Sequence, residues 1–176
     1  MKEIARRYAQ TLFDLAKQEN ALEAIHVAFQ GLGQILKNKE EFRIFIHNPL
    51  LSIEERSSIL KHIFDNRIPP LLYKFLLFIN LKNRLNILGN IFESFDQLCL
   101  EEHNQVRALL ETAFDLEESQ KENMRQRLGQ RYHKKILLDT HLKQELLGGF
   151  RFLVQGILYD SSIKSQLEEF RQKVLA

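Results

Sequence analysis

The sequence contains no tryptophan, only one cysteine and only three prolines among its 176 residues. The single cysteine, Cys99, excludes an intramolecular disulfide and is typical of a protein from a reducing compartment. The longest uninterrupted apolar run, residues 75–79, is far shorter than the roughly 20 residues that cross a bilayer. We therefore expect a chain that does not itself span a membrane.

The chain also lacks a large excess of charge of either sign. The chain carries 25 Lys and Arg against 23 Asp and Glu, so it lacks the basic bias that binding to a phosphate backbone requires. Residues 1–4 do not form a charged and then apolar leader, and we expect them to begin a helix rather than a signal or transit peptide. A bacterial cytoplasmic origin is the simplest interpretation.

Metal and cofactor motifs are missing as well. The six histidines are scattered, and only Cys99 and His103 lie one helical turn apart, whereas a zinc site needs about four ligands. Gly148 and Gly149 lack the lysine and the spacing of a phosphate-binding loop, so they predict a backbone bend before a strand. We expect no metal, no cofactor and no enzymatic activity.

Two polar clusters have simple structural interpretations. The group Asp160, Ser161 and Ser162 could suggest a nucleophile, but no base is positioned beside it, and these residue types are favoured as helix caps. The basic stretch from Arg125 to Lys135 is accompanied by glutamates and by a single aromatic residue. It therefore favours a solvated helix face over a nucleic-acid site.

The first part of the chain is rich in helical periodicity. Apolar residues recur at helical spacing, and the breaks between them predict about six helices, over residues 4–16, 21–37, 42–46, 53–64, 70–81 and 84–103. Pro49 ends the third helix, Ser52 and Glu55 form a capping box for the fourth, and Pro69 and Pro70 open the fifth. These helices predict a compact bundle.

The fifth helix carries more apolar side chains than one core-facing stripe requires. Apolar residues wrap most of its circumference, including Phe75, Phe78 and Ile79. Two interpretations remain open with about equal weight. The helix is either buried on all sides, or it forms part of a groove that receives a partner helix.

After Asn104 the period of the pattern changes. A strand over 106–113 is followed by a polar helix through about residue 132, for which Asp115 and Glu118 predict a second capping box. Short strands are expected over 136–138, 150–154 and 157–159, with a tight turn at Gln155 and Gly156, and a helix over 161–175 ends the chain. The fold class is therefore mainly α: a helical bundle over residues 1–104, then a small α+β module over 105–176.

Three short motifs stand in a fixed order along the chain. They are residues 5–9 (ARRYA), residues 82–85 (KNRL), and the closing segment in which Gly148 and Gly149 precede Asp160 and Ser162. In this order and spacing the chain resembles the delta subunit of F-type ATP synthases, called the oligomycin-sensitivity-conferring protein in mitochondria. The resemblance covers essentially the whole chain. It departs from the family at the hairpin turn and at Ser161, where turn-forming residues are kept.

The resemblance implies a non-enzymatic subunit of the peripheral stalk that prevents the catalytic head from turning with the rotor during proton-driven ATP synthesis. It implies a groove between the first and fifth helices for the N-terminal helix of an alpha subunit. Its candidate residues are Tyr8, Thr11, Leu12, Leu15, Phe75, Phe78, Ile79 and Lys82. The C-terminal module, with the structural motif Gly148, Gly149, Asp160 and Ser162, would meet the ends of the stalk b subunits.

This assignment would place the chain at the cytoplasmic face of the bacterial inner membrane, held there indirectly through the complex. No nucleic-acid partner is expected. A free-standing adaptor that binds helices is the alternative, because its sequence would look similar. It would differ in failing to co-purify with ATP synthase subunits.

Overall fold

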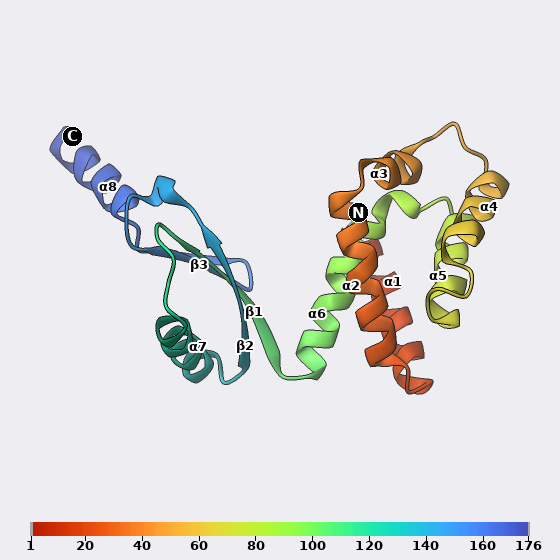
Figure 1. The fold of residues 1–176 in the computed structure, drawn as a ribbon, viewed down its shortest axis with the longest axis horizontal. Helices are drawn as coiled ribbons and strands as arrows, with labels where there is room; N and C mark the ends of the chain where they lie inside the picture. The colour runs from red at the N-terminus through yellow and green to blue at the C-terminus, as the bar shows by residue number, and fades with distance from the viewer. Residues whose placement is uncertain (1, 176) are drawn as a thin grey trace. The chain divides into compact units, whose positions relative to one another are not determined.

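The computed structural model describes residues 2–175, which fold into two compact units (Figure 1). Unit 1 is Met1–Cys99 and unit 2 is Leu100–Ala176. Unit 1 is entirely helical in its described part, and unit 2 combines a sheet with helices. The expectation of a mainly α chain with an α+β module at its C-terminal end is therefore confirmed.

Unit 1 contains the helices that the periodicity predicts. They are α1 (Lys2–Gln18), α2 (Leu22–Asn38), α3 (Glu40–His47), α4 (Ile53–Phe64), α5 (Pro70–Leu81) and α6 (Leu88–Glu102), with a short 3₁₀ turn η1 (Leu85–Ile87) before α6. The end of α6, from Leu100 onward, belongs to unit 2. The predicted capping box of α4 is present. The Glu55 amide donates to Ser52 Oγ at 3.1 Å, and the Ser52 amide donates to Glu55 Oε2 at 2.8 Å. Hydrogen bonds from Ser52 lower the pKa of Glu55.

The core of unit 1 combines small alanines with aromatic rings. Ala5, Ala9 and Ala16 of α1 are fully buried, which allows close approach of neighbouring helices. The rings of Phe29 and Phe95 pack edge to face at 5.2 Å between α2 and α6. One connected apolar core therefore holds these helices in place.

Unit 2 is built on a four-stranded sheet with the order β2-β1-β3-β4. Its elements are β1 (Gln105–Thr112), α7 (Glu118–Tyr132), β2 (Lys135–Leu142), η2 (Gln144–Leu146), β3 (Phe150–Val154), β4 (Ile157–Asp160) and α8 (Ile163–Leu175). Strands β1 and β2 are parallel, so α7 is their crossover helix, whereas β3 and β4 form an antiparallel hairpin (Figure 1). Strand β2 is longer than the predicted 136–138.

The predicted start of the polar helix is wrong. Helix α7 begins at Glu118, and the residue that precedes it is Glu117, whose amide donates to Gln120 Oε1 at 3.0 Å. Asp115 therefore lies too early in the chain to cap the helix. The physical reason is Leu116, which packs against the core of unit 2 and delays the first helical turn until the chain has passed it.

The hairpin turn between β3 and β4 is confirmed. Val154 pairs with Ile157, and the two turn residues, Gln155 and Gly156, have φ values of 50° and 79°. Positive φ at both central positions is the geometry that matches the twist of the two strands. The hairpin carries Tyr159, which pairs with Phe152.

Candidate partner-binding groove

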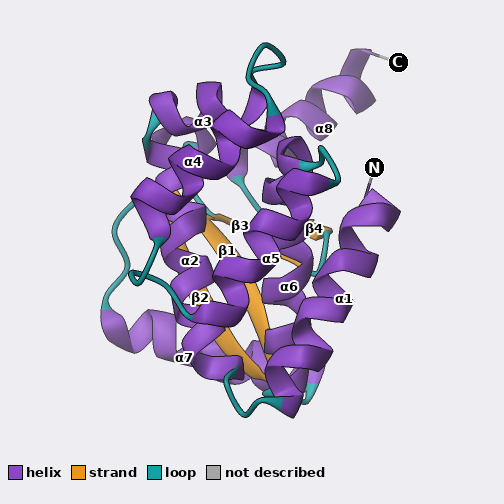
Figure 2. Cartoon of the chain, turned by 90° about the vertical axis from the view of Figure 1, so that its right-hand side faces the viewer, coloured by secondary structure: helices purple, strands orange, loops and turns teal. Residues whose placement is uncertain are grey.

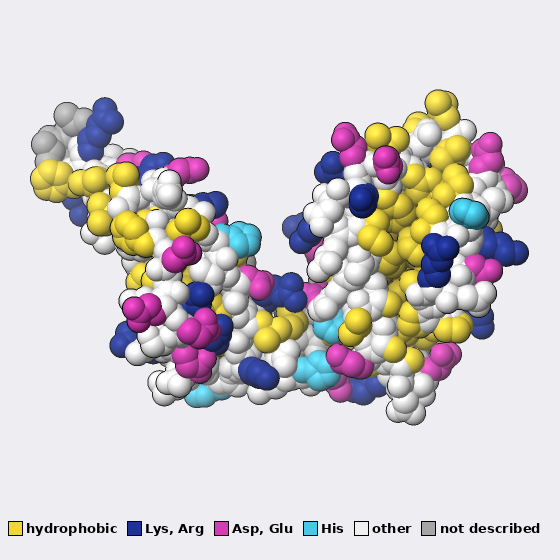
Figure 3. Space-filling view, viewed as in Figure 1, with side chains coloured by type: hydrophobic (Ala, Val, Ile, Leu, Met, Phe, Trp, Pro, Cys, Tyr) yellow, Lys and Arg dark blue, Asp and Glu magenta, His cyan; other side chains and the backbone are white. Residues whose placement is uncertain are grey.

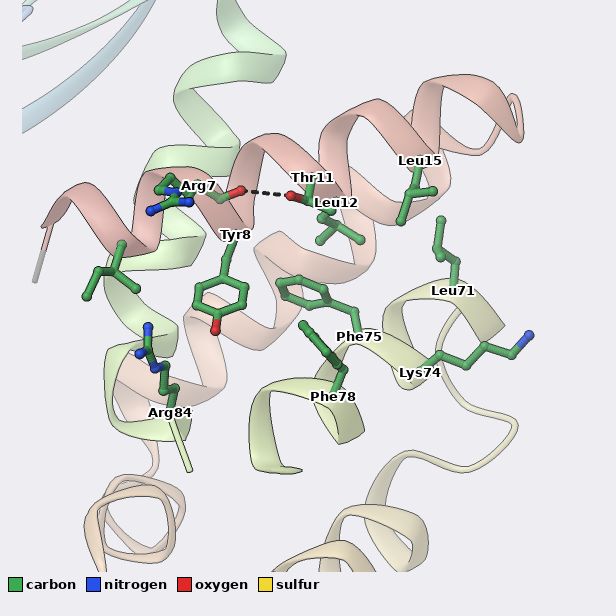
Figure 4. Close-up of a pocket in the computed structure, with 11 residues that line it drawn as sticks. Arg7, Tyr8, Thr11, Leu12, Leu15, Leu71, Lys74, Phe75, Phe78 and Arg84 are labelled. Atoms are coloured by element: carbon green, nitrogen blue, oxygen red, sulfur yellow. Dashed lines mark hydrogen bonds between the residues drawn. The ribbon is translucent and has the colours of Figure 1, made fainter. Parts of the chain in front are cut away.

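A groove opens between α1 and α5 on the surface of unit 1. Figure 2 shows the ribbons of these two helices, with α1 at the right-hand side of the view. Its volume is about 690 Å³. It is lined by Ile4, Arg7, Tyr8, Thr11, Leu12, Leu15, Leu71, Lys74, Phe75, Phe78 and Arg84. Helical spacing puts the lining residues of α1 on one face of that helix and those of α5 on one face of that helix, whereas Arg84 follows α5. The close-up shows Tyr8 of α1 beside Phe75 and Phe78 of α5 (Figure 4).

The floor of the groove is buried and its walls are exposed. Leu12 and Phe75 are 0% and 7% exposed, whereas Leu15 and Phe78 are 40% and 44% exposed. The Tyr8 ring meets the Phe78 ring edge to face at 6.1 Å, which joins the two helices across the groove. Large apolar side chains that stay in contact with water in this way are typical of an interaction surface.

The rim of the groove is basic. No Asp or Glu is among its lining residues, whereas three of them are basic: Arg7, Lys74 and Arg84. The Arg84 guanidinium lies 5.7 Å from the centre of the Tyr8 ring, and the Lys82 ammonium lies 5.6 Å from the centre of the Phe78 ring. Such contacts hold the cationic side chain near an aromatic ring, and the ring does not neutralise its positive charge. The groove therefore combines an apolar floor with positive charge at its edge.

The exposure of Phe78 decides between the two interpretations of the fifth helix. Leu72, Leu76 and Ile79 of α5 are buried in the core, but Phe78 and Leu81 are not, so the helix is not buried on all sides. Figure 3 shows hydrophobic side chains gathered in a hollow of unit 1 near α3, α4 and α5. Helix α5 therefore supports the core with one face and the groove with another.

The predicted groove residues divide into two sets. The structure brings together Tyr8, Thr11, Leu12, Leu15, Phe75 and Phe78 at the groove. Ile79 does not line it, because this side chain is fully buried in the core of unit 1. Lys82 follows the end of α5 and reaches the groove only through the Phe78 ring.

Sequence reasoning missed other lining residues: Ile4, Arg7, Leu71, Lys74 and Arg84. The signal for Ile4 and Leu71 was present, since each lies four residues before a predicted groove position, Tyr8 and Phe75. Arg84 had no such signal. It follows Asn83, whose φ of 52° turns the chain out of helical geometry.

Buried polar groups fix the orientation of α5 and of the turn after it. Asn80 is fully buried, and its side-chain amide donates to the Ile53 carbonyl at 2.9 Å and to Ser57 Oγ at 2.8 Å. Arg56, which is 6% exposed, donates to Asn83 Oδ1 at 2.6 Å. These bonds anchor α5 and its following turn to α4, which holds Lys82 and Arg84 at the groove. Arg56 also donates to the Asn48 carbonyl at 3.0 Å.

The closing motif, which consists of Gly148, Gly149, Asp160 and Ser162, shapes the backbone of unit 2 before α8. Gly149 has a φ of 74°, and a Cβ there would lie 2.3 Å from the Ser161 carbonyl oxygen, so this position requires glycine. The atoms nearest to a Cβ on Gly148 would be those of the Ile163 side chain, with Cδ1 at 2.5 Å. The Ser165 amide donates to Ser162 Oγ at 3.3 Å, which caps α8.

Asp160 organises the same cap from the end of β4. The Ser162 amide, the Ser165 hydroxyl and Arg151 Nε each donate to its carboxylate at 2.8–2.9 Å. Burial acts to raise the pKa of Asp160, but these hydrogen bonds outweigh it and hold the pKa of the carboxyl well below its usual range. The predicted capping role of Asp160 and Ser162 is confirmed.

The groove offers no set of groups for catalysis. Its one hydroxyl on a short side chain, Thr11 Oγ1, donates to the Arg7 carbonyl of its own helix at 3.0 Å. Among residues 2–175, no group of three or more His, Cys, Asp or Glu side chains could hold a metal ion. None of the described helices is both long enough and apolar enough to cross a membrane. The groove can bind an apolar segment but has no reactive constellation.

Comparison with known proteins identifies the family. The model of the family described as ATP synthase delta (OSCP) subunit matches residues 4–174. The chain belongs to the ATP synthase delta (OSCP) family. Members of this family are peripheral-stalk components of ATP synthase and are structural rather than catalytic subunits. The partners of the chain are therefore within the ATP synthase complex.

Relatives match the chain over nearly its whole length. The ATP synthase subunit delta of Anaeromyxobacter sp. is 32% identical over 175 residues, which cover 99% of this chain and 98% of the relative. The ATP synthase subunit delta of Clostridium kluyveri is 28% identical over 170 residues, which cover 97% and 94% of the two chains.

Solved structures share the fold. A chain in the mitochondrial ATP synthase hexamer of Toxoplasma gondii superposes with a TM-score of 0.78 at 22% identity, covering 98% of this chain and 97% of that one. A chain in the Polytomella F-ATP synthase gives a TM-score of 0.52 at 18% identity, over 56% of this chain and 87% of that one.

Proposed function

We propose that this chain is a stator clamp that links the catalytic head of ATP synthase to the peripheral stalk. The groove between α1 and α5 would bind the N-terminal helix of an alpha subunit, and unit 2 would bind the ends of the stalk b subunits. Holding both would resist the torque of the rotor during proton-driven ATP synthesis. The chain would work at the cytoplasmic face of the bacterial inner membrane, attached through the complex.

The groove is the observation that carries this proposal. From Ile4 to Leu15 its α1 wall extends over about 17 Å, which corresponds to about three turns of a bound helix. An amphipathic helix of that length would cover Leu15 and Phe78, the exposed apolar walls, with its own apolar face. Carboxylates at the edges of that helix would meet the basic rim.

The separation into two units suits a clamp. Each site would be built within its own unit, because every residue that lines the groove belongs to unit 1 and the closing motif belongs to unit 2. Binding at one site would then leave the geometry of the other unchanged. Domains with separate cores influence each other little unless their interface is large.

Substitution of Phe78 tests the groove directly. Phe78→Asp should abolish binding of an alpha-subunit N-terminal peptide, because forcing a carboxylate against an apolar partner face costs at least several kcal/mol. Isothermal titration calorimetry would measure the loss, and circular dichroism should show unchanged helicity since Phe78 is 44% exposed.

Leu81→Asp is the matched control for this experiment. Leu81 is on the same helix and is 62% exposed, but it does not line the groove, so the peptide should bind this variant as it binds the parent. Equal loss of binding in both variants, or loss of fold in Phe78→Asp, would contradict the placement of the site.

Truncation tests how the partners divide between the units. A fragment ending at Asn104 should bind the alpha peptide within about tenfold of the intact chain, a difference of about 1.4 kcal/mol, and should fail to retain b-subunit fragments. If the fragment holds the stalk, the partners are assigned to the wrong units. If the intact chain fails to co-purify with any ATP synthase subunit, a free-standing helix-binding adaptor becomes the better interpretation.

A further inference from the structure

A second groove lies within unit 2, between α7 and the sheet. Its volume is about 550 Å³. Met124 and Leu128 of α7 and the two rings of Phe150 and Phe152 of β3 supply its apolar part, and these rings pack edge to face at 5.2 Å. The α7 wall from Ser119 to Arg131 is about 18 Å long.

The charged side chains of this groove are all of one sign. Arg127 and Arg131 lie one turn apart on α7, and no Asp or Glu lines the groove. The nearby glutamates are engaged elsewhere on the helix, since Glu118 and Glu122 accept from Arg125 at 2.8 and 3.0 Å. Like charges at this spacing disfavour the helix that carries them. An anionic ligand would relieve that repulsion.

Neither arginine is neutralised by the part of the chain that the structure describes. Arg127 is exposed and has no hydrogen bond or ion pair with any residue in 2–175. The Arg131 guanidinium lies 4.9 Å from the centre of the Tyr159 ring and donates to the Tyr159 hydroxyl at 3.5 Å. The Tyr132 hydroxyl donates to the same oxygen at 3.1 Å. Arg131 is thus oriented by neutral groups, and no carboxylate among the described residues pairs with it.

The position of β3 limits the form of the ligand. Strand β3 is hydrogen-bonded to β1 on one side and to β4 on the other, so the groove offers no free strand edge. A bound segment must therefore satisfy its own backbone hydrogen bonds, which a helix does and an extended peptide does not.

We propose that the groove between α7 and β3 is the stalk-binding site of unit 2, and that it receives an amphipathic helix whose apolar face is bordered by carboxylates one turn apart. The carboxylates pair with Arg127 and Arg131, and the apolar face covers Met124 and Leu128. This inference rests on the proposed function, in which unit 2 binds the b subunits. It adds the surface and the chemistry of the contact.

Neutralisation of single arginines in the full-length chain tests the proposal. The probe is a soluble fragment of the b subunit from the same organism, titrated by calorimetry. Arg127→Gln and Arg131→Gln should each weaken binding by about tenfold, and together by more, whereas Arg125→Gln on the other side of α7 should change it by less than about twofold. Raising the salt concentration should weaken the parent more than the double variant.

Different results of this experiment would contradict the α7–β3 groove as the site and the stalk-binding role of unit 2. If the double variant binds the b fragment as tightly as the parent, or if Arg125→Gln weakens binding as much as the groove variants, the groove is not the site. If the unmodified chain does not bind the fragment at all, the stalk-binding role of unit 2 is wrong, and the occupant named here is wrong with it. Binding of a nucleic acid by the parent, lost in the double variant, would also overturn the proposal.

Discussion

Replacement of Gly149 by alanine should destabilise unit 2 by about 3 kcal/mol. The φ of 74° alone costs an L-residue about 1 kcal/mol. The new Cβ would lie 2.3 Å from the Ser161 carbonyl oxygen, although carbon and oxygen ordinarily stay roughly 3.3 Å apart. The backbone at Ser161 must therefore move by about 1 Å.

That movement disturbs two further interactions. The Ser161 amide donates to the Phe150 carbonyl at 3.0 Å, which ties the start of β3 to the end of β4. The next residue, Ser162, caps α8. A lost hydrogen bond and a weakened cap contribute about 1 kcal/mol each, which gives the total of about 3 kcal/mol.

Gly156→Ala is the matched control. Gly156 has a φ of 79° at the hairpin turn, but a Cβ there would meet nothing within 4 Å, so only the backbone penalty of about 1 kcal/mol applies. Hydrogen exchange followed by mass spectrometry on the intact chain would report β3 and β4, with unit 1 as an internal reference. Where exchange follows unfolding of unit 2, the two variants should differ by about thirtyfold.

Two results would refute this reasoning. Equal exchange in Gly149→Ala and Gly156→Ala would show that the backbone of Ser161 yields without cost. If Gly149→Ala accelerates exchange in unit 1 as much as in unit 2, the effect is not local to the closing motif.

Two other predictions concern buried and partly buried charges. Arg56→Lys should destabilise unit 1 by about 1–3 kcal/mol, because an ammonium cannot reproduce the fork that serves Asn83 and the Asn48 carbonyl; unchanged urea unfolding of this unit would contradict it. Asp160→Asn should cost about 1 kcal/mol near neutral pH. Since the folded pKa of Asp160 is lowered, its contribution is present above the unfolded value of about 3.9 and is lost as the pH falls through the folded pKa. The stability difference between parent and variant should therefore shrink in acid, and a constant difference would exclude the carboxylate as its cause.

Local sequence signals accounted for most of the helices and for the hairpin. Ser52 and Glu55, Pro70, and the pair Gln155 and Gly156 act within a few residues of themselves, so their effect can be deduced without knowing the fold. The capping box expected at Asp115 is absent. Leu116 packs against core residues of unit 2 that are distant in the sequence, and this contact decides where α7 begins.

The face of α5 that opens to the groove could not be deduced from periodicity. Apolar residues surround this helix, so Phe78 and Ile79 look alike in the sequence although one is exposed and the other buried. The choice is made by Asn80, which bonds to α4 and thereby sets the rotation of the helix. The parallel pairing of β1 and β2 was hidden for a different reason, since the crossover helix between them has no fully buried residue.

The outer edge of β4 makes the unassembled chain prone to aggregation. In the described sheet β4 pairs only with β3, and its residues Ile157 and Leu158 are 52% and 54% exposed. An open strand with aliphatic side chains is a template for pairing with another copy. Chain made in excess of its partners is therefore expected to aggregate, and balanced synthesis of the subunits would protect solubility as well as stoichiometry.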